Sequence, residues 1–156
     1  MARLSILCGL PGSGKTTTAL AMAAHGAVRM CPDGWMRALG VDLWDEEARA
    51  RIEALQWSLT QDVLCAGSDV VIEWGTWARA ERDALRIWCR EHGVAVSLLH
   101  LDVALDELVR RLDERNPLDG EVHITHAQLD DWYRTVWQPP SPEELRLFDP
   151  LPEGAS

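Results

Sequence analysis

Short runs of consecutive apolar residues alternate along the chain with longer segments in which apolar residues recur every three or four positions. The runs are typical of buried β-strands, and the longer segments are typical of helices. The expected strands are residues 3–7, 27–30, 69–74 and 94–101. The expected helices between and after them are residues 15–24, 45–66 and 77–92. This alternation predicts an α/β fold with a mostly parallel sheet and helices on both faces.

The longest of these helices has an apolar stripe by which it can pack on the sheet. Its members are Ile52, Leu55, Leu59 and Val63. Such spacing places side chains on one helical face, so we expect these four to be buried together.

The last third of the chain continues the helical pattern around a break. Apolar residues from Leu105 to Leu112 predict one helix, which ends at Asn116, Pro117 and Gly120. Thr125 and Gln128 have the spacing of a capping box that opens a second helix. The apolar face expected for that helix is Leu129, Trp132, Tyr133 and Val136. Residues 145–148 are a plausible last strand, and residues 151–156 are expected to form a loose tail.

Composition narrows the class of protein. A chain of 156 residues with 47% hydrophobic residues is sufficient for one domain with one core. No apolar run approaches the roughly 18–20 residues that cross a bilayer. The apolar run at the N-terminus lacks a small-residue cleavage site after it, so we interpret it as a strand and expect a cytoplasmic protein. The sequence leaves the oligomeric state open.

The net charge of −10 argues against two kinds of partner, bulk duplex DNA and anionic membranes. A small anionic ligand in a local basic pocket remains compatible with it. The four cysteines have no metal-binding spacing, and free thiols are the expectation for them.

Residues 9–16, GLPGSGKT, match the P-loop pattern G-x-x-x-x-G-K-[ST], with a strand expected before them and a helix after them. This pattern predicts a site for ATP with Mg²⁺, in which glycines let backbone N–H groups surround phosphate oxygens. The alternative, a glycine turn with no ligand, is disfavoured by the full match in the required context. The residues expected to bind nucleotide here are Gly9, Leu10, Pro11, Gly12, Ser13, Gly14, Lys15, Thr16 and Thr17.

Lys15 is the only lysine in the chain, and the 14 other basic residues are arginine. A compact ammonium can reach the β- and γ-phosphates inside a tight loop, whereas the planar guanidinium is bulkier. The hydroxyl of Thr16 is the expected ligand for Mg²⁺.

Two carboxylates follow neighbouring strands at the edge where the P-loop lies. Asp33 comes just after the second strand, where a kinase needs a base beside the acceptor hydroxyl. The alternative for Asp33 is a turn residue or a helix N-cap. Glu73 ends the third strand and is expected to hold Mg²⁺ through water, or else to be a charged residue at a strand exit. The residues expected to line the acceptor site with Asp33 are Trp35, Arg37, Trp77 and Arg82.

Arg111 and Arg115 lie four residues apart on one predicted helix, directly before the Pro/Gly break. A segment of this kind can close over ATP and place guanidinium groups on the transferring phosphoryl group. The alternative is a solvated helix face paired with Asp113 and Glu114.

Seven of the eight tryptophans fall into two expected groups. Those on apolar helix faces, expected in the core, are Trp57, Trp88 and Trp132. Those expected near the cleft are Trp35, Trp74, Trp77 and Trp137.

The stretches GLPGSGKTTTA, CPDGWMRALG, DVVIEWGTWARAERDAL, RLDERN and WQPPSPEE occur in the order seen in small bacterial P-loop kinases. Over residues 3–148 the chain resembles the AAA-type ATP-binding proteins similar to chloramphenicol phosphotransferase, zeta toxins and the kinase half of polynucleotide kinase. The resemblance implies a three-layer nucleoside-kinase fold with a five-stranded parallel sheet. It also implies Asp33 as general base, a lid at about 111–124 with Arg111 on the phosphoryl group, and Pro139 and Pro140 near the adenine.

The sequence therefore favours an ATP-dependent kinase, a single domain of residues 1–150, acting on a hydroxyl of a small molecule. Two alternatives stay open. One is a nucleotide-binding regulator or slow NTPase with no acceptor, and the other is a kinase of nucleic-acid 5′-hydroxyl ends.

Overall fold

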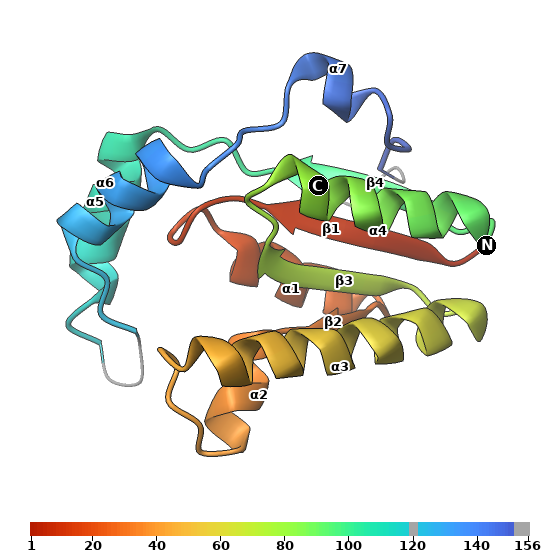
Figure 1. The fold of residues 1–156 in the computed structure, drawn as a ribbon, viewed down its shortest axis with the longest axis horizontal. Coiled ribbons are helices and arrows are strands. Elements are labelled where there is room, and N and C mark those ends of the chain that lie inside the picture. The colour runs from red at the N-terminus through yellow and green to blue at the C-terminus, as the bar shows by residue number, and fades with distance from the viewer. Residues whose placement is uncertain (119–121, 152–156) are drawn as a thin grey trace.

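The computed structural model describes residues 1–118 and 122–151, and within them the chain forms a four-stranded parallel sheet (Figure 1). The strands are β1 (Arg3–Cys8), β2 (Val28–Met30), β3 (Val70–Gly75) and β4 (Ala95–His100). They are hydrogen-bonded in the order β2-β3-β1-β4. Because all run in the same direction, their carboxyl ends share one edge, and ligands bind at this edge in sheets of this class.

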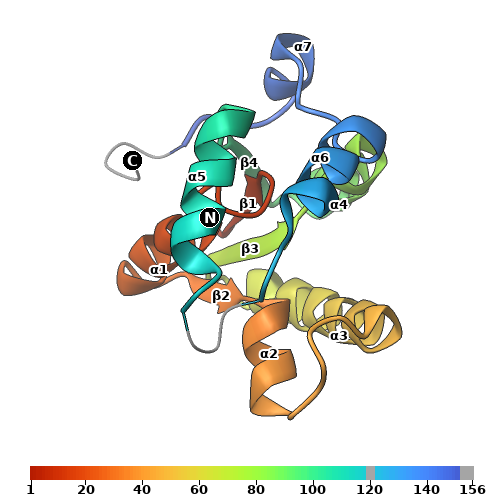
Figure 2. The ribbon, with the colours of Figure 1, turned by 90° about the vertical axis from the view of Figure 1, so that its left-hand side faces the viewer.

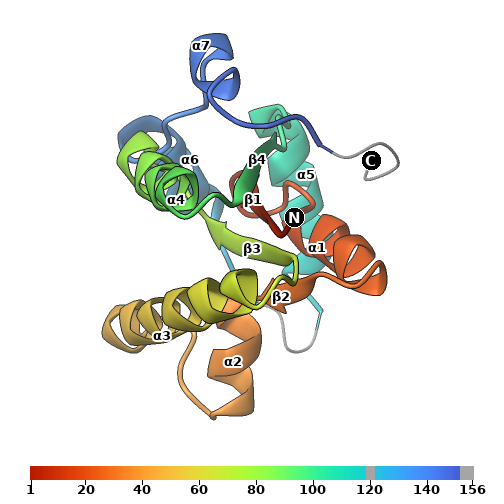
Figure 3. The same ribbon diagram turned by 90° about the vertical axis from the view of Figure 1, so that its right-hand side faces the viewer.

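Helices cover both faces of the sheet, which makes the fold three-layered (Figure 3). The helix α1 (Lys15–Ala24) lies on one face, where Ala19 packs with Leu7 and Val71. The helices α3 (Glu46–Cys65) and α4 (Arg79–Glu91) lie on the other face, over Leu4 and Ile6. The predicted α/β class with a parallel sheet is confirmed. None of the described helices is both long and apolar enough to span a membrane.

The apolar face predicted for α3 is partly wrong, since Ile52 is buried and Val63 packs against the core but the other two residues are exposed. Leu55 and Leu59 are 60% and 39% exposed. The buried side chains of this helix are Ile52, Gln56, Thr60 and Leu64. Gln56 Oε1 accepts a hydrogen bond of 2.9 Å from the indole N–H of Trp74. A polar side chain takes this inward position because a half-buried indole N–H needs a partner.

The five-stranded sheet is also wrong, because no fifth strand forms in the part of the chain that the structure describes. A short helix, α7 (Pro142–Leu145), occupies the start of the predicted strand, with Ser141 as its N-cap. After α7, the Asp149 N–H donates to Val96 O, and Asp149 Oδ2 accepts from the Val96 N–H, both at 2.8 Å. Pro150 has no N–H with which to continue a ladder. The segment therefore lies beside β4 without becoming a strand.

Two helices, α5 (Leu105–Arg115) and α6 (His126–Thr135), lie beyond the carboxyl ends of the strands (Figure 2). They share an apolar cluster with the P-loop residue Leu10; its buried members on this side are Leu108, Leu112, Ile124 and Leu129. The side chain of Asn116 donates to Ile124 O at 2.8 Å and accepts from the Ile124 N–H at 3.0 Å. We call α5, α6 and the segment between them the α5–α6 hairpin.

The α5–α6 hairpin differs in one respect from the sequence prediction. Tyr133 and Val136 were expected on the apolar face of α6, but each is 43% exposed, because Leu129 and Trp132 fill the contact with α5. The predicted lid of residues 111–124 falls in this hairpin, and its residues 119–121 lie outside the described residues. Most of the predicted tail, residues 152–156, lies outside them as well.

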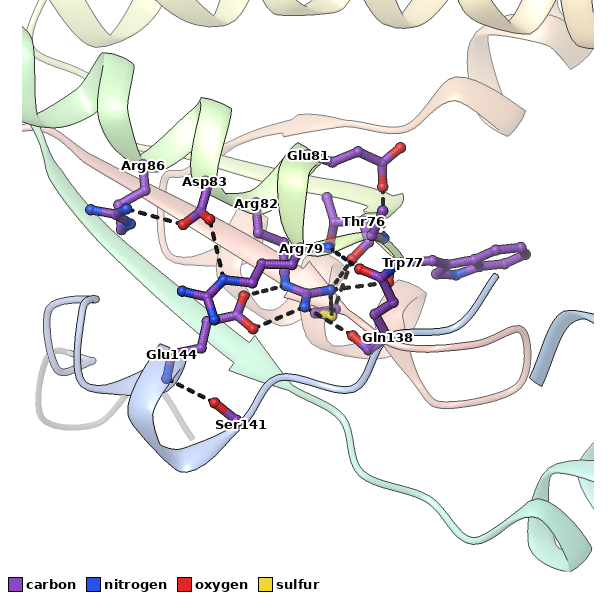
Figure 4. Close-up of polar contacts among 12 residues, drawn as sticks. Thr76, Trp77, Arg79, Glu81, Arg82, Asp83, Arg86, Gln138, Ser141 and Glu144 are labelled. Atoms are coloured by element: carbon purple, nitrogen blue, oxygen red, sulfur yellow. Dashed lines mark hydrogen bonds and ion pairs between the residues drawn. The ribbon is translucent and has the colours of Figure 1, made fainter. Parts of the chain in front are cut away.

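Arg82, in the first turn of α4, is fully buried and connects separate parts of the chain (Figure 4). Its Nε and Nη2 donate to the two carboxylate oxygens of Glu144 at 2.6 and 3.0 Å. Its Nη1 donates to the carbonyl oxygens of Thr76 and Trp77 at 2.8 and 3.2 Å. Its Nη2 also donates to Gln138 O at 2.9 Å. The guanidinium group therefore fastens residues 138–144 to the end of β3.

We expect Glu144→Ala to lower the free energy of unfolding by about 3–5 kcal/mol, because it leaves the buried charge of Arg82 without its partner. Urea denaturation measures the change. The matched control is Glu143→Ala, one residue earlier on α7, whose side chain is 74% exposed; it should change the same free energy by less than about 0.5 kcal/mol. Equal effects of the two substitutions would show that the buried ion pair does not hold this segment.

Candidate active site

The loop between β1 and α1 folds as a phosphate-binding loop requires. Gly12 and Gly14 have φ angles of +86° and +98°, in the left-handed region that favours glycine. A Cβ atom at Gly9 would lie 2.4 Å from Ser13 Oγ, so a side chain there would clash. Helix α1 begins at Lys15, and the backbone N–H groups of its first turn lack partners within the helix. This arrangement suits a bound phosphate group.

The ammonium group of Lys15 lies against the inside of this loop. Its Nζ donates to Gly9 O at 2.7 Å and to Leu10 O at 3.0 Å. Burial lowers the pKa of Lys15 from 10.5 to about 8, and the nearby Cys8 thiol and Glu73 carboxylate oppose that shift. A phosphate group beside Nζ would favour the charged form, so this lysine is poised to bind an anion.

Thr16 and Glu73 lie together at the end of β3. Thr16 Oγ1 donates to Glu73 Oε1 at 3.0 Å. Arg29, on β2, holds the same carboxylate through Nε to Oε2 at 2.6 Å and Nη2 to Oε1 at 3.1 Å. A hydroxyl and an oriented carboxylate are oxygen ligands of the kind that Mg²⁺ prefers, and Mg²⁺ usually needs only one or two protein ligands beside phosphates and waters. The residues therefore fit a magnesium ion.

Asp33 lies in a short helix that the sequence did not predict, α2 (Pro32–Ala38). Its N-cap is Cys31, and Pro32 occupies the first helical position, which is favourable for proline. Arg49 Nη2, from α3, donates to Asp33 Oδ1 at 2.5 Å. The second oxygen, Oδ2, has no hydrogen-bond partner among the described residues. Neither a turn nor an N-cap describes Asp33, since it lies within the first turn of the helix.

One cavity of about 650 Å³ connects these groups. Its lining comes from the P-loop, the end of β3, α2, α3 and the α5–α6 hairpin. The predicted residues that line it are Pro11, Gly12, Gly14, Lys15, Thr16, Thr17, Asp33, Arg37, Glu73, Trp77, Arg111 and Arg115. The structure thus brings the P-loop, the two predicted carboxylates and the two arginines of the predicted lid to the same cavity.

Seven predicted site residues do not line this cavity, and three of them, Gly9, Leu10 and Ser13, belong to the P-loop itself. Trp35 packs against the core cluster that contains Leu4 and Ile6, and Arg82 is buried in the network with Glu144. Neither lines the cavity, so the acceptor contacts expected for them are not supported by their positions. Pro139 lines a separate cavity of about 160 Å³, and Pro140 is buried.

The expected division of the tryptophans is partly wrong. Trp57 and Trp88 pack against the core, as predicted, and Trp74 and Trp77 line the cavity. Trp132, which was expected in the core, lines the cavity too, because α6 lies over the strand ends rather than on the sheet.

Sequence reasoning missed several residues of the site. The missed side chains are Arg29, Trp44, Glu46, Arg49, Glu53, Glu81 and Trp132. Three of them, Glu46, Arg49 and Glu53, are spaced three and four residues apart and form a polar stripe on α3. The sequence contained this stripe. Because α2 was not predicted, nothing in the sequence indicated that this side of α3 faces the site.

Arg111 reaches the P-loop from α5. Its Nη1 donates to Gly12 O at 3.1 Å, while its Nε donates to Glu107 at 2.8 Å. Arg115 lies one turn further along the helix, close enough to Lys15 to contribute to lowering its pKa. The alternative interpretation, a helix face paired with Asp113 and Glu114, does not describe Arg111, whose ion pair is with Glu107.

Comparisons with known proteins agree on a class of fold. A family model described as an AAA domain matches residues 4–140. No protein of curated function matches the chain.

Solved structures resemble the chain over most of its length. A candidate kinase from Chloroflexus aurantiacus has a TM-score of 0.70 and 18% identity, covering 89% of this chain and 78% of that one. The APS kinase CysC of Mycobacterium tuberculosis, solved with AMPPNP and APS, has a TM-score of 0.58 and 19% identity, with coverages of 89% and 83%.

A chain of the Pnkp1/Rnl/Hen1 complex has a TM-score of 0.60 and 21% identity over 88% of this chain. The present chain spans only 44% of that protein. At these identities the likeness concerns the fold.

The single lysine makes the P-loop directly observable. With ¹³Cε-labelled lysine, the protein should give one lysine signal that titrates near pH 8 without nucleotide, because burial disfavours the ammonium. ATP should move the midpoint upward, because phosphate oxygens stabilise the charged form. Titration followed by NMR measures both midpoints.

Two variants calibrate this titration. Glu73→Gln should lower the midpoint, because the Glu73 charge raises the pKa of Lys15. Glu47→Gln, on the exposed side of α3, should leave it unchanged. A midpoint near 10.4 in the free protein, the value of an exposed lysine, would contradict the buried position of Nζ.

Proposed function

Since the chain belongs to the AAA domain family and has a P-loop kinase-like fold, we propose that it is an ATP-dependent phosphotransferase. In this proposal the enzyme moves the γ-phosphate of ATP to a hydroxyl group of a small molecule. The kinase domain proposed here covers residues 1–150. Its donor side is the P-loop, and its acceptor side is the space beside Asp33.

The observation that carries this proposal is the shared cavity. Lys15 and Thr16 line one part of it and Asp33 lines another. A phosphotransferase must hold donor and acceptor together out of water, because positioning and electrostatic stabilisation supply most of its catalysis. An NTPase without an acceptor needs only the part of such a cavity that Lys15 and Thr16 line.

On the donor side, residues 9–17 hold the phosphates, and the Lys15 ammonium pairs with the β- and γ-phosphate oxygens. Thr16 and Glu73 would hold Mg²⁺, the latter through water, with the Glu73 carboxylate oriented by Arg29. When bound, Mg²⁺ neutralises charge on the phosphate oxygens. The smaller cavity, lined by Leu10, Trp137 and Pro139, is proposed for the adenine.

On the acceptor side, Asp33 is the proposed general base. Arg49 holds Oδ1, so Oδ2 can accept the proton of the acceptor hydroxyl. The acceptor oxygen forms a bond to the γ-phosphorus, the bond from that phosphorus to the β,γ-bridging oxygen breaks, and ADP leaves with the electron pair. Arg37 and Trp77 also contact the acceptor in this proposal.

The α5–α6 hairpin supplies the remaining charge. Arg111 and Arg115 face the cavity from α5 and are proposed to stabilise the transferring phosphoryl group. The proposed lid is residues 111–124, of which Arg111, Arg115, Val122 and Ile124 line the cavity. Its closure would exclude water from the reaction.

We expect Asp33→Asn to lower phosphate transfer by about 10²- to 10⁴-fold, the usual contribution of a general base. ATP binding should persist, because Asp33 is not part of the P-loop. The measurement is transfer of label from γ-labelled ATP, with Mg²⁺, into a small-molecule extract supplemented with nucleosides and 5′-hydroxyl oligonucleotides. Mass spectrometry of the labelled product identifies the acceptor.

The control for this substitution is Asp62→Asn, an exposed aspartate on α3, which should transfer label at the wild-type rate. Free phosphate released equally by wild type and Asp33→Asn, with no labelled product, would replace the kinase by an NTPase. Labelled oligonucleotide, made at a rate that falls steeply with salt, would instead indicate a kinase of nucleic-acid ends.

A further inference from the structure

The acceptor side of the cavity is acidic. The charged side chains that line it, away from the P-loop and the hairpin arginines, are Asp33, Arg37, Glu46, Arg49, Glu53 and Glu81. Asp33 and Arg49 neutralise each other in their ion pair. Three glutamates then remain against one arginine, Arg37, so the lining of this space carries negative charge.

These glutamates have unused hydrogen-bonding capacity. Glu53 has no hydrogen bond or ion pair within the part of the chain that the structure describes. Among the described residues, the exposed Glu81 accepts only the Ala78 N–H, through Oε2 at 3.0 Å. A carboxylate inside a cavity is stabilised by a charged donor, and a ligand can supply one.

The charges around Glu53 also favour a positively charged group of a ligand. Burial raises the pKa of its carboxyl group, Arg49 opposes the rise, and the charges of Glu81 and Asp33 add to it. The neighbouring charges therefore include two acids and one base, and that base is already bonded to Asp33. A positive charge placed among them would relieve the repulsion.

The rest of this space is aromatic. The tryptophans that line it are Trp44, Trp74, Trp77 and Trp132. Trp132 lies in the middle, with its ring centroid 5.4 Å from that of Trp77 and 6.4 Å from that of Trp44. Indole faces attract both apolar rings and ammonium groups. The aromatic walls and the carboxylates thus favour the same kind of ligand for independent reasons.

We propose that the phosphate acceptor is a ring-containing hydroxyl compound that carries a protonated amine, with the ring against the tryptophans and the ammonium group against Glu53 and Glu81. This proposal rests on the proposed kinase function, whose acceptor it specifies. The ammonium group is not altered in the reaction; it orients the hydroxyl toward Asp33. Carboxylated and phosphorylated acceptors are repelled by the same glutamates.

Three probes of similar size separate charge from shape. Phenylalaninol has a phenyl ring, a hydroxyl and an ammonium group; N-acetylphenylalaninol lacks the charge; 3-phenyllactate carries a negative charge instead. Their binding to the full-length chain can be followed by tryptophan fluorescence, since a phenyl ring is not excited with indole. We expect phenylalaninol to bind at least tenfold more tightly than the neutral probe, with 3-phenyllactate weakest, as a charge-assisted hydrogen bond implies.

Glu53→Gln should remove most of the difference between phenylalaninol and its N-acetyl form. Glu47→Gln, the same change on the exposed side of α3, should preserve it. Equal binding of the three probes, no measurable binding of phenylalaninol, or tightest binding of 3-phenyllactate would overturn the proposed acceptor class, and the wild-type series decides this even if a variant misfolds.

The two proposals can fail separately. Label transferred to an acceptor that is itself anionic or uncharged, and that carries no amine, would retain the kinase and reject the amine-bearing acceptor. A tenfold preference for phenylalaninol, with no label transferred to any compound, would reject the kinase while retaining the cationic ligand of the cavity.

Discussion

The arrangement of the site depends on the buried guanidinium group of Arg82. It is bonded at once to the end of β3, to the backbone at Gln138 and to both oxygens of Glu144. It also approaches the Cys8 sulfur, immediately before the P-loop, at 3.7 Å. A planar group with five fixed donors is suited to join so many acceptors at defined angles. Arg82 therefore fixes three segments relative to one another: the P-loop strand, the β3–α4 turn and the C-terminal segment. Their fixed positions determine the shape of the cavity.

Within that frame, charge is separated along the cavity. Lys15, Arg111 and Arg115 give the P-loop part of the cavity a positive lining, while Glu53 and Glu81 lie near each other in another part of the lining. Glu73 is the exception in the positive part, and there Arg29 holds it beside Thr16, where a metal ion belongs. Such a separation lets one space bind a polyanionic donor and an acceptor of opposite charge without cross-binding.

The P-loop, the strand–helix alternation and the positions of Asp33 and Glu73 at strand ends were accessible from the sequence, because each depends on local pattern or strand order. The helix α2 was not, since seven residues opening with Pro-Asp-Gly also describe a turn. The inward face of α3 was misjudged because Gln56 satisfies the indole of Trp74, a partner 18 residues away. The fifth strand failed because Asp149 and Pro150 interrupt the ladder. Long-range partners thus decided the failures at α3 and at Asp149, whereas α2 was missed because its local sequence is ambiguous.

The segment beside β4 has a consequence for how copies of the chain meet. β4 is an edge strand, and such an edge offers free backbone groups to any extended chain in solution. At Val96 both backbone groups are taken by Asp149, whose carboxylate is also paired with Arg90 at 2.8 Å. A charged side chain and a proline therefore stand where a neighbouring molecule would have to add its strand, and this sheet edge resists the edge-to-edge pairing from which β-aggregates grow.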